Sequence, residues 1–180
     1  MVKTICFTGH RWLPKGTEEW VFGQLLKHIQ RAVNKGYLKY ISGGAIGFDQ
    51  MAAKCVILSK AFDSRIELII ARPFPSQDRT WPPHIKVKFK EILDAADDVV
   101  DVSEDPYSVA KMHKRNEWMV DRAHAVIGGW NGQRKGGTYN CIEYTKSKGK
   151  PILIINPITK EVQWEMEKVD ETIAMSKRMR

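Results

Sequence analysis

The chain has 180 residues, 43% of them hydrophobic and 28% charged, and a formal net charge of +8. This length and composition indicate one globular domain over residues 1–180 and exclude a disordered or collagen-like chain. No stretch approaches the roughly 20 apolar residues of a membrane span, and the first residues do not resemble a signal peptide, so we expect a cytoplasmic protein without a membrane partner.

Strand-like and helix-like segments alternate along the chain. In order, we expect a strand at 3–7, a helix at 17–35 capped by Thr17, a strand at 38–42, a helix at 47–62, a strand at 66–71, a helix at 85–95, a strand at 98–102, a helix at 108–122, a strand at 125–130, a helix at 139–148, a strand at 151–155, a helix at about 163–176 and a basic tail at 177–180. This alternation predicts an α/β fold, an open and mainly parallel sheet with helices on both faces.

Composition also restricts the partners and cofactors. The basic excess favours an anionic partner but does not separate a nucleotide from a nucleic acid. Cys6, Cys55 and Cys141 are far apart and lie in apolar settings, so we expect buried, reduced thiols. The histidines form no zinc-type pair with a cysteine or with each other. We therefore expect neither a metal site nor a cofactor.

A first glycine cluster joins the second predicted strand to the helix that follows it. The residues of interest there are Ser42, Gly43, Gly44, Ala45, Gly47 and Asp49. Glycines leave backbone amides without a neighbouring Cβ, and a helix start supplies unpaired N–H groups. The cluster is therefore a candidate anion or nucleotide site, although a tight structural turn explains the glycines equally well.

The segment 72–83 interrupts the alternation. Its prolines forbid a helix or an inner strand, and it also carries Arg72, Gln77 and Trp81. We interpret this segment as a lid or wall over a site, because long loops in compact domains are often functional. A proline-stiffened surface loop is the alternative.

Two further segments carry polar candidates. Asn116 shares one face of the helix at 108–122 with apolar residues, so its amide either ties down a neighbouring loop or reaches a ligand. The strand at 125–130 ends in Trp130, and a second glycine-rich turn with Gly136, Gly137 and Thr138 follows. Loops after strands of a parallel sheet meet at its carboxyl edge, where ligands of open α/β sheets lie.

Five motifs in this order resemble the YpsA-like members of the SLOG superfamily, which also includes the LOG phosphoribohydrolases and the DNA-processing protein DprA. They are Thr8-Gly9-His10-Arg11, the run 42–49 with Ala52-Ala53, the segment from Arg72-Pro73 through Gln77 to Trp81, Arg115-Asn116 with Met119 to Asp121, and Gly136-Gly137-Thr138. The similarity spans residues 3–158.

This resemblance implies a Rossmann-like domain that binds nucleotides or nucleotide-derived ligands. Carried over to this chain, it implies a phosphate or ribose-phosphate held by the Ser42 hydroxyl, by the amides of Gly43, Gly44, Ala45 and Gly47, and by Gly136, Gly137 and Thr138. The candidates for charged contacts are Arg11, Arg72 and Arg115. Asp49 suits a ribose hydroxyl or a helix cap, and Trp81 and Trp130 offer flat surfaces for a base, although each tryptophan also suits simple packing.

One departure bears on catalysis. LOG-type enzymes carry glutamates soon after the Gly-Thr of their second glycine motif, whereas Thr138 is followed here by Tyr139 and Asn140, with Glu143 too late for a simple match. An amide at Asn140 cannot act as a carboxylate base. Asp49 is the one candidate catalytic residue, provided that it points into the cleft.

Three functions are therefore considered. The leading hypothesis is a sensor or sequestering protein for a nucleotide-derived ligand, such as an ADP-ribose-like molecule or a cyclic nucleotide. The alternative is an enzyme that cleaves the N-glycosidic bond of a nucleotide. Binding of single-stranded nucleic acid ranks third, because the basic residues are spread along the chain without an aromatic-basic repeat. Formation of a homo-oligomer is left open.

Overall fold

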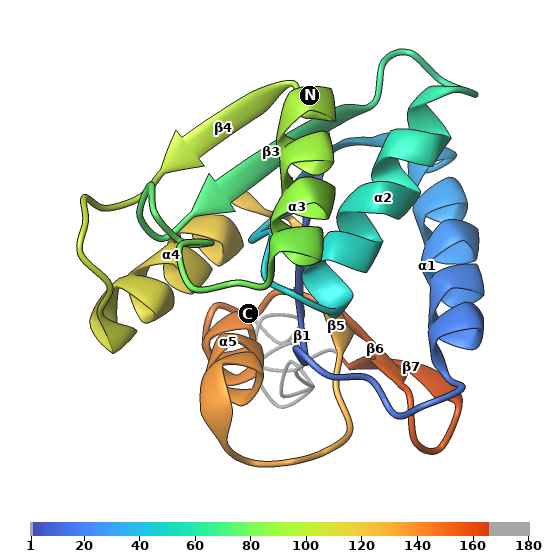
Figure 1. Ribbon diagram of the computed structural model, residues 1–180. Helices are drawn as coiled ribbons and strands as arrows, with labels where there is room; N and C mark the ends of the chain where they lie inside the picture. Colours follow the sequence, from blue (N-terminus) through green and yellow to red (C-terminus); the bar gives the residue numbers. More distant parts are fainter. Residues whose placement is uncertain (1, 166–180) are drawn as a thin grey trace, which may run out of the picture.

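A single seven-stranded sheet forms the centre of the computed structural model, which describes residues 2–165 (Figure 1). Its strands are β1 (Lys3–Gly9), β2 (Tyr37–Ser42), β3 (Glu67–Arg72), β4 (Asp98–Asp101), β5 (Ala125–Gly129), β6 (Ile152–Asn156) and β7 (Glu161–Glu165). Their order in the sheet is β4-β3-β2-β1-β5-β6-β7. The first six strands are parallel and β7 is antiparallel to β6. The predicted open, mainly parallel α/β sheet is confirmed.

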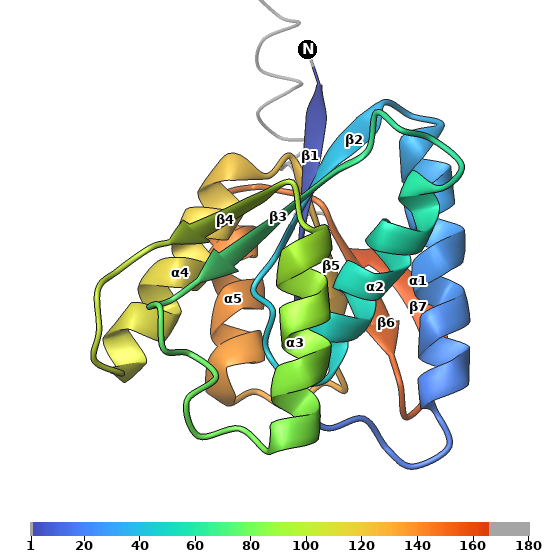
Figure 2. The same cartoon turned by 45° about the horizontal axis from the view of Figure 1, so that its top comes forward.

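Helices cover both faces of this sheet, as the sequence predicts (Figure 2). They are α1 (Glu18–Val33), α2 (Phe48–Lys60), α3 (Pro83–Ala95), α4 (Val109–Arg122) and α5 (Gly136–Ser147). Alternate residues of β1 point to opposite faces. Phe7 packs with the buried side chains of α1, α2 and α3, whereas Cys6 packs with those of α4 and α5. These two apolar layers pack against the two faces of the sheet and hold in place the strands whose carboxyl ends carry the loops of interest.

The end of the described chain differs from the prediction. Residues 163–165 belong to β7 and not to a helix that starts at 163, so that start is wrong. The alternation of Val162 and Trp164 with polar neighbours has the period of a strand, and the segment pairs with β6 after a turn in which Lys160 adopts a positive φ of 57°. The rest of the expected helix and the basic tail lie outside the described residues.

Two helix starts also differ from expectation. Thr17 is the N-cap of α1, but its hydroxyl donates to the carbonyl of Pro14 at 2.7 Å and does not cap the helix. Helix α5 begins at Gly136 and not at 139. The glycines expected in a turn therefore form the first turn of a helix, where their amides have no intrahelical partner.

All three cysteines are buried and free, as expected. Burial raises the pKa of the Cys141 thiol to about 11, and the pKa of Cys55 is raised to about 12 by the same cause. These thiols remain protonated at neutral pH and are unreactive.

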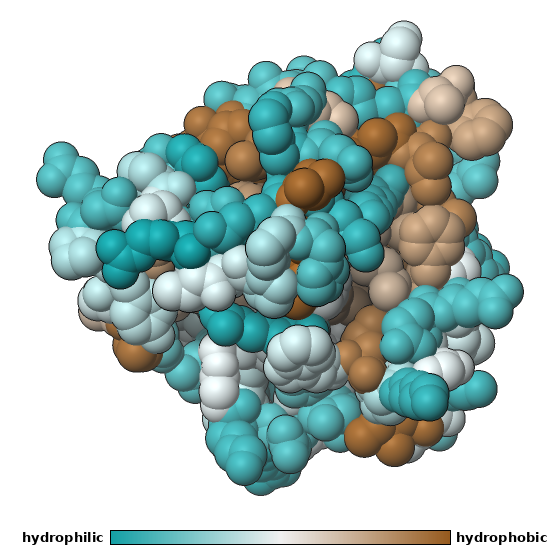
Figure 3. All heavy atoms as spheres, viewed as in Figure 1, coloured by the Kyte–Doolittle hydropathy of each residue, from teal (hydrophilic) through white to brown (hydrophobic). Residues whose placement is uncertain are grey.

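Hydrophilic residues predominate on the surface shown in Figure 3, and hydrophobic residues gather in separate patches. No helix in the described part of the chain is both long and apolar enough to cross a bilayer. Within residues 2–165, no group of three or more His, Cys, Asp or Glu side chains is placed to hold a metal ion.

Candidate functional site

A cavity of about 610 Å³ lies at the carboxyl edge of the sheet, among the loops that follow β1, β2 and β5 and the first half of α4. The predicted site residues that line it are Thr8, His10, Arg11, Ala45, Asp49, Arg115, Asn116, Gly136, Gly137 and Thr138. The other predicted residues, which are absent from this lining, are Gly9, Ser42, Gly43, Gly44, Gly47, Arg72, Gln77, Trp81 and Trp130. The structure thus brings the two glycine clusters to one cavity, the first of them through Ala45 and Asp49.

Arg115 forms the floor of this cavity. Its side chain comes from α4, and the residue is only 4% exposed. One terminal nitrogen, Nη1, donates to the carbonyl of Gly43 at 2.6 Å and to that of Ala71 at 3.3 Å, and Nε donates to Asn116 Oδ1 at 2.9 Å. A guanidinium can donate five hydrogen bonds. Arg115 therefore places a positive charge under the cavity with capacity for a further acceptor.

Asp49 is an acidic residue in the same cavity as Arg115. It lies in the first turn of α2 and is 4% exposed, and its Oδ1 makes no hydrogen bond within the described residues. Burial raises the pKa of this carboxyl to about 6, an effect that Arg115, the amide of Ala45 and Arg11 partly oppose. A carboxyl with a pKa near neutrality can gain or lose a proton under ordinary conditions. The cavity therefore holds a hydrogen-bonding group whose charge depends on pH.

The first glycine turn is filled by the protein itself. A Cβ at Gly43 would lie 2.0 Å from Arg115 Nη1 and 2.7 Å from Asp49 Oδ2, and a Cβ at Gly47 would lie 2.2 Å from the carbonyl oxygen of Arg11. The Gly44 amide donates to Ser42 Oγ at 3.2 Å, and that hydroxyl donates to the carbonyl of Asp49 at 2.8 Å. The Ser42 hydroxyl and the Gly44 amide are thus occupied in holding the turn.

The second glycine cluster is open. A Cβ at Gly136 or Gly137 would meet no atom within 4 Å. Lys135 occupies the N-cap position of α5, and its side chain makes no capping hydrogen bond among the described residues. The first amides of a helix without a cap are free to bind an anion. Of the two clusters, the start of α5 is the one that exposes its backbone to the cavity.

Arg72 and the two predicted stacking tryptophans are engaged elsewhere. The guanidinium of Arg72 binds both carboxylate oxygens of Asp101, at 2.7 and 2.8 Å. Trp81 packs on Phe89 with ring centroids 5.1 Å apart, which closes the α3 side of the core. Trp130 stacks on Tyr139 at 6.2 Å, and its indole N–H donates to the carbonyl of Gln133 at 2.9 Å.

Polar side chains hold the surrounding loops in place. His10 Nε2 lies 2.8 Å from Asn131 Oδ1 and so connects the β1 loop to the β5 loop. Asn116 both lines the cavity and donates to the carbonyl of Gly137 at 3.4 Å. Gln77 Nε2 donates to the carbonyl of Gly43 at 3.1 Å, so the proline-rich segment binds the back of the first glycine turn.

The structure also adds residues that the sequence did not single out for this site. They are Tyr107, Val109, Met112, His113, Gln133 and Lys135. Val109 and Met112 share the apolar face of α4 with Asn116, and such a face normally indicates core. Here Tyr107 and Val109 are exposed, although Val120 on the same helix is fully buried. The sequence did contain one sign of this exposure. Asn116 is a polar residue on the otherwise apolar face of α4, and it marks the point from which this face borders the cavity and not the core.

Glu143 does not compensate for the glutamate that LOG-type enzymes carry. It is absent from the cavity lining, and its carboxylate lies 3.5 Å from Lys146 Nζ on the outside of α5. Among the residues that line the cavity, Asp49 alone is a carboxylic acid. The site therefore resembles a binding cavity with one acid more closely than a paired-carboxylate active site.

Comparison with known proteins identifies sequence relatives. The profile of the YspA SLOG family (YpsA) matches residues 18–159. The SPbeta prophage-derived protein YoqJ of Bacillus subtilis (strain 168) is 38% identical over 135 residues, which cover 68% of this chain and 78% of YoqJ. The UPF0398 protein BH1768 of Halalkalibacterium halodurans is 25% identical over 123 residues, covering 68% of this chain and 65% of that protein.

Two solved structures share the fold. DNA processing protein A from Helicobacter pylori, described for its single-stranded DNA binding mode, superposes with a TM-score of 0.61 and 18% identity over 98% of this chain and 72% of its own. DprA from Streptococcus pneumoniae gives a TM-score of 0.62 and 18% identity over 86% of this chain and 50% of its own. At this identity the likeness establishes the architecture.

Proposed function

Because the chain belongs to the YspA SLOG family, we propose that its cavity binds a phosphorylated nucleotide unit, with the phosphate at the start of α5. The observation that carries the proposal is the open first turn of α5 beside a buried cation. Gly136 and Gly137 face space that no protein atom fills, and Arg115 lies in the floor of the same cavity. Helix amides and a guanidinium both favour a doubly charged oxyanion.

Two further basic side chains add positive charge to the cavity. Arg11 and Lys135 line it and are exposed, so they can move to meet an incoming anion. Tyr107, Val109 and Met112 form an apolar wall on the α4 side. A ligand with a phosphate at one end and a ring at the other matches this division, since nucleotides combine both.

We expect Asp49 to contact the ribose of the ligand. Its unpartnered Oδ1 is an acceptor buried in a cavity that otherwise attracts anions. An ionised carboxylate repels a phosphate at short range but accepts a hydrogen bond from a ribose hydroxyl. Binding of such a ligand without turnover is the behaviour of a sensor or a sequestering protein.

A pair of glycine variants tests the proposal. Gly137→Ala places a methyl group in the cavity, whereas Gly23→Ala adds one to an exposed position of α1 where no atom lies within 4 Å. We expect calorimetric titration with AMP, ADP-ribose and cyclic AMP to show binding of at least one ligand. Gly137→Ala should weaken it about tenfold or more through steric overlap, and Gly23→Ala should leave it unchanged. Absence of heat with every ligand and intact protein would refute the proposal.

Single-stranded nucleic acid is the second candidate ligand. It is favoured by the fold shared with the Helicobacter pylori protein described as binding single-stranded DNA, and by the net charge of +8. A single strand would present the same phosphates to the start of α5. Gel shifts with a short oligonucleotide at increasing salt test this candidate, since phosphate contacts make affinity fall steeply with salt. No shift at low salt would remove it.

A further inference from the structure

A second cavity of about 490 Å³ adjoins the first. Phe74, Gln77 and Arg79 of the β3–α3 loop line it, together with Tyr107. Tyr107 also lines the first cavity, so one aromatic side chain borders both. The two cavities therefore meet at a phenol ring.

The ring of Tyr107 is exposed and yet fixed in position. It is 62% exposed, and its centroid lies 5.8 Å from that of Phe74, with the rings at 89°. Phe74 itself is only 4% exposed. Such an edge-to-face pair is a favourable aromatic geometry. A rigid aromatic side chain that stays in solvent is suited to stack with the ring of a ligand.

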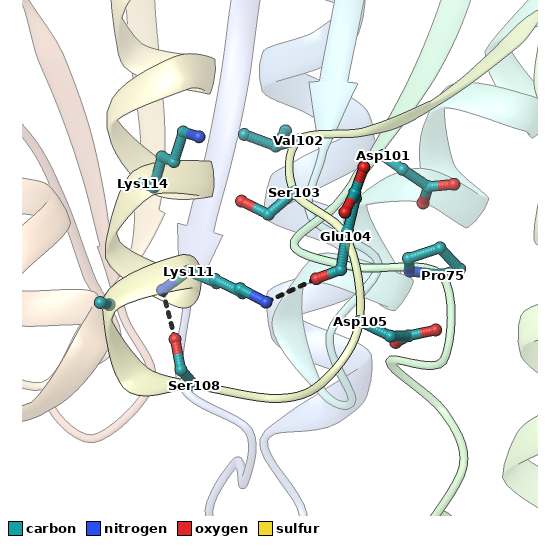
Figure 4. Close-up of a pocket in the computed structure, with 10 residues that line it drawn as sticks. Pro75, Asp101, Val102, Ser103, Glu104, Asp105, Ser108, Lys111 and Lys114 are labelled. Atoms are coloured by element: carbon teal, nitrogen blue, oxygen red, sulfur yellow. Dashed lines mark hydrogen bonds between the residues drawn. The ribbon is translucent and has the colours of Figure 1, made fainter.

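Hydrogen bonds hold the loop that carries Tyr107. Lys111 Nζ donates to the carbonyl of Glu104 at 2.7 Å, and the Lys111 amide donates to Ser108 Oγ at 3.2 Å (Figure 4). Lys111 Nζ also donates to the carbonyl of Pro106 at 2.9 Å. Asp105 accepts from the amide of Ser76 at 3.2 Å, which joins this loop to the β3–α3 loop. These hydrogen bonds already order the loop in the folded protein. Binding of a ligand therefore does not have to offset the conformational entropy of ordering it.

Charge divides the two cavities. The first has Arg11, Arg115 and Lys135 against the single acid Asp49. The second has Arg79 against Asp105, and Asp105 already accepts hydrogen bonds from Ser76. A balanced, aromatic space favours a neutral base, whereas the basic cavity favours phosphate.

Beyond the second cavity, positive and negative side chains balance. A third cavity of about 900 Å³, drawn in Figure 4, is lined by Asp101, Glu104 and Asp105 against Lys111 and Lys114. Lys111 is already bound to carbonyl groups of its own loop. Asp101 is paired with Arg72, which leaves two acids against two lysines, so this cavity carries no excess charge that would attract a phosphate.

We propose that the second cavity is a base subsite and that the ligand carries two consecutive nucleotide units, one on each side of Tyr107. The proposal rests on the proposed function, because the first unit is the nucleotide held at α5. Gln77 has a buried Oε1 that makes no hydrogen bond within the described chain, and its Nε2 is held by Gly43. The amino group of a base bound in this cavity can donate the hydrogen bond that Gln77 Oε1 lacks.

The experiment compares ligands that differ by one nucleoside. Calorimetry at fixed low salt uses a deoxynucleoside 3′,5′-bisphosphate and a 5′-phosphorylated dinucleotide, which both carry two phosphates. We expect the dinucleotide to bind about tenfold more tightly, the usual effect of stacking one base. A tetranucleotide should add little, because the cavity beyond the second has no excess of positive charge.

Variants locate the effect. Tyr107→Ala should remove most of the higher affinity for the dinucleotide, and Tyr107→Phe should keep it. The control is Phe62→Ala, which should leave both affinities unchanged, because Phe62 is an aromatic residue that is 89% exposed and lies outside these cavities. Equal affinities of the wild-type protein for the two ligands would overturn the inference, and so would a Tyr107→Ala variant that weakens both by the same factor. If the bisphosphate binds and depends on Gly137 while the dinucleotide gains nothing, the proposed function stands without the second subsite. Binding of neither ligand would refute both.

Discussion

The two glycine clusters of this protein have the same kind of sequence and opposite structural roles. At the start of α2, the space above Gly43 and Gly47 is filled by Arg115, by Asp49 and by the backbone at Arg11. At the start of α5, the space above Gly136 and Gly137 is empty. The first cluster lets the chain pack against itself, and the second leaves amides available to a ligand.

The difference shows that a glycine-rich turn is not a ligand site by composition alone. What decides is whether the volume released by the missing Cβ is used by the protein or left to solvent. In this molecule the closed turn contacts Asp49 and Arg115, and both line the same cavity as the open turn. The closed cluster thus supports the open one.

The largest expected effect is on folding, and it separates the clusters directly. Gly47 and Gly136 have nearly equal positive φ values, 90° and 85°. Alanine at Gly136 bears the cost of a positive φ, about 1–2 kcal/mol. Alanine at Gly47 bears a larger cost, because its ψ of −122° lies outside the left-handed helical region that other residues can adopt. At Gly47 the new Cβ would also lie 2.2 Å from a backbone oxygen. We expect Gly47→Ala to lower the free energy of unfolding by more than about 4 kcal/mol and Gly136→Ala by about 1–2 kcal/mol.

Urea denaturation followed by circular dichroism measures both variants. Equal losses of stability would show that the first turn relaxes without cost, and the distinction between a closed and an open cluster would then fail. A Gly47→Ala variant that does not fold is consistent with the expectation, provided that Gly136→Ala folds.

Arg115 provides the next largest effect, because its side chain binds the first cluster and lines the cavity together with the second. Arg115→Met removes the charge that most opposes the raised pKa of the buried Asp49 carboxyl, as well as the hydrogen bonds to Gly43 and Ala71. Breaking a buried charge pair costs about 3–5 kcal/mol. We expect this loss of unfolding free energy at pH 8, where Asp49 is ionised, and a smaller loss at pH 5, where it is largely protonated.

The double variant Asp49→Asn/Arg115→Met is the control for this coupling. It should be less destabilised at pH 8 than the sum of the single variants, because the uncompensated carboxylate is gone. Additive losses, with no dependence on pH, would show that Arg115 acts only through its hydrogen bonds to the backbone.

The sequence predicted the fold well because its signals are local. Buried strands such as β3 and β6 are short apolar runs, and the helices between them show regular apolar spacing. The error at β7 has the same origin, since Val162 and Trp164 alternate within a segment too short to separate from a helical pattern. Only the pairing with β6 decides the matter.

The site was harder to predict, since its geometry depends on contacts between distant segments. Nothing in the local sequence shows that Arg72 pairs with Asp101, or that Arg115 reaches Gly43, which is 72 positions away. Tyr107 was missed for a similar reason, because an aromatic residue in a loop gives no sign of its neighbours. Residue types at the carboxyl edge could be foreseen, and their pairing could not.

The smallest expected effect concerns the charge of Asp49 during binding. Burial raises its pKa to about 6 from the ordinary 3.8 of an aspartic acid, so between these two values the folded protein keeps a proton that the unfolded chain releases. The contribution of Asp49 to the free energy of unfolding therefore falls as the pH rises from 3.8 to about 6 and is constant at higher pH. The same ionisation introduces a negative charge into the cavity, so the affinity for an anionic ligand should fall as the pH rises through about 6.

A phosphodiester ligand isolates this effect, because its single charge is constant between about pH 5 and 8. With a dinucleoside monophosphate, we expect the wild-type affinity to fall about fivefold over that range, as one added charge at several ångströms implies. His10 and His113 also line the cavity. They are retained in Asp49→Asn, so the difference between the two pH profiles reports Asp49. Parallel profiles would mean that the carboxyl does not change its charge beside the ligand.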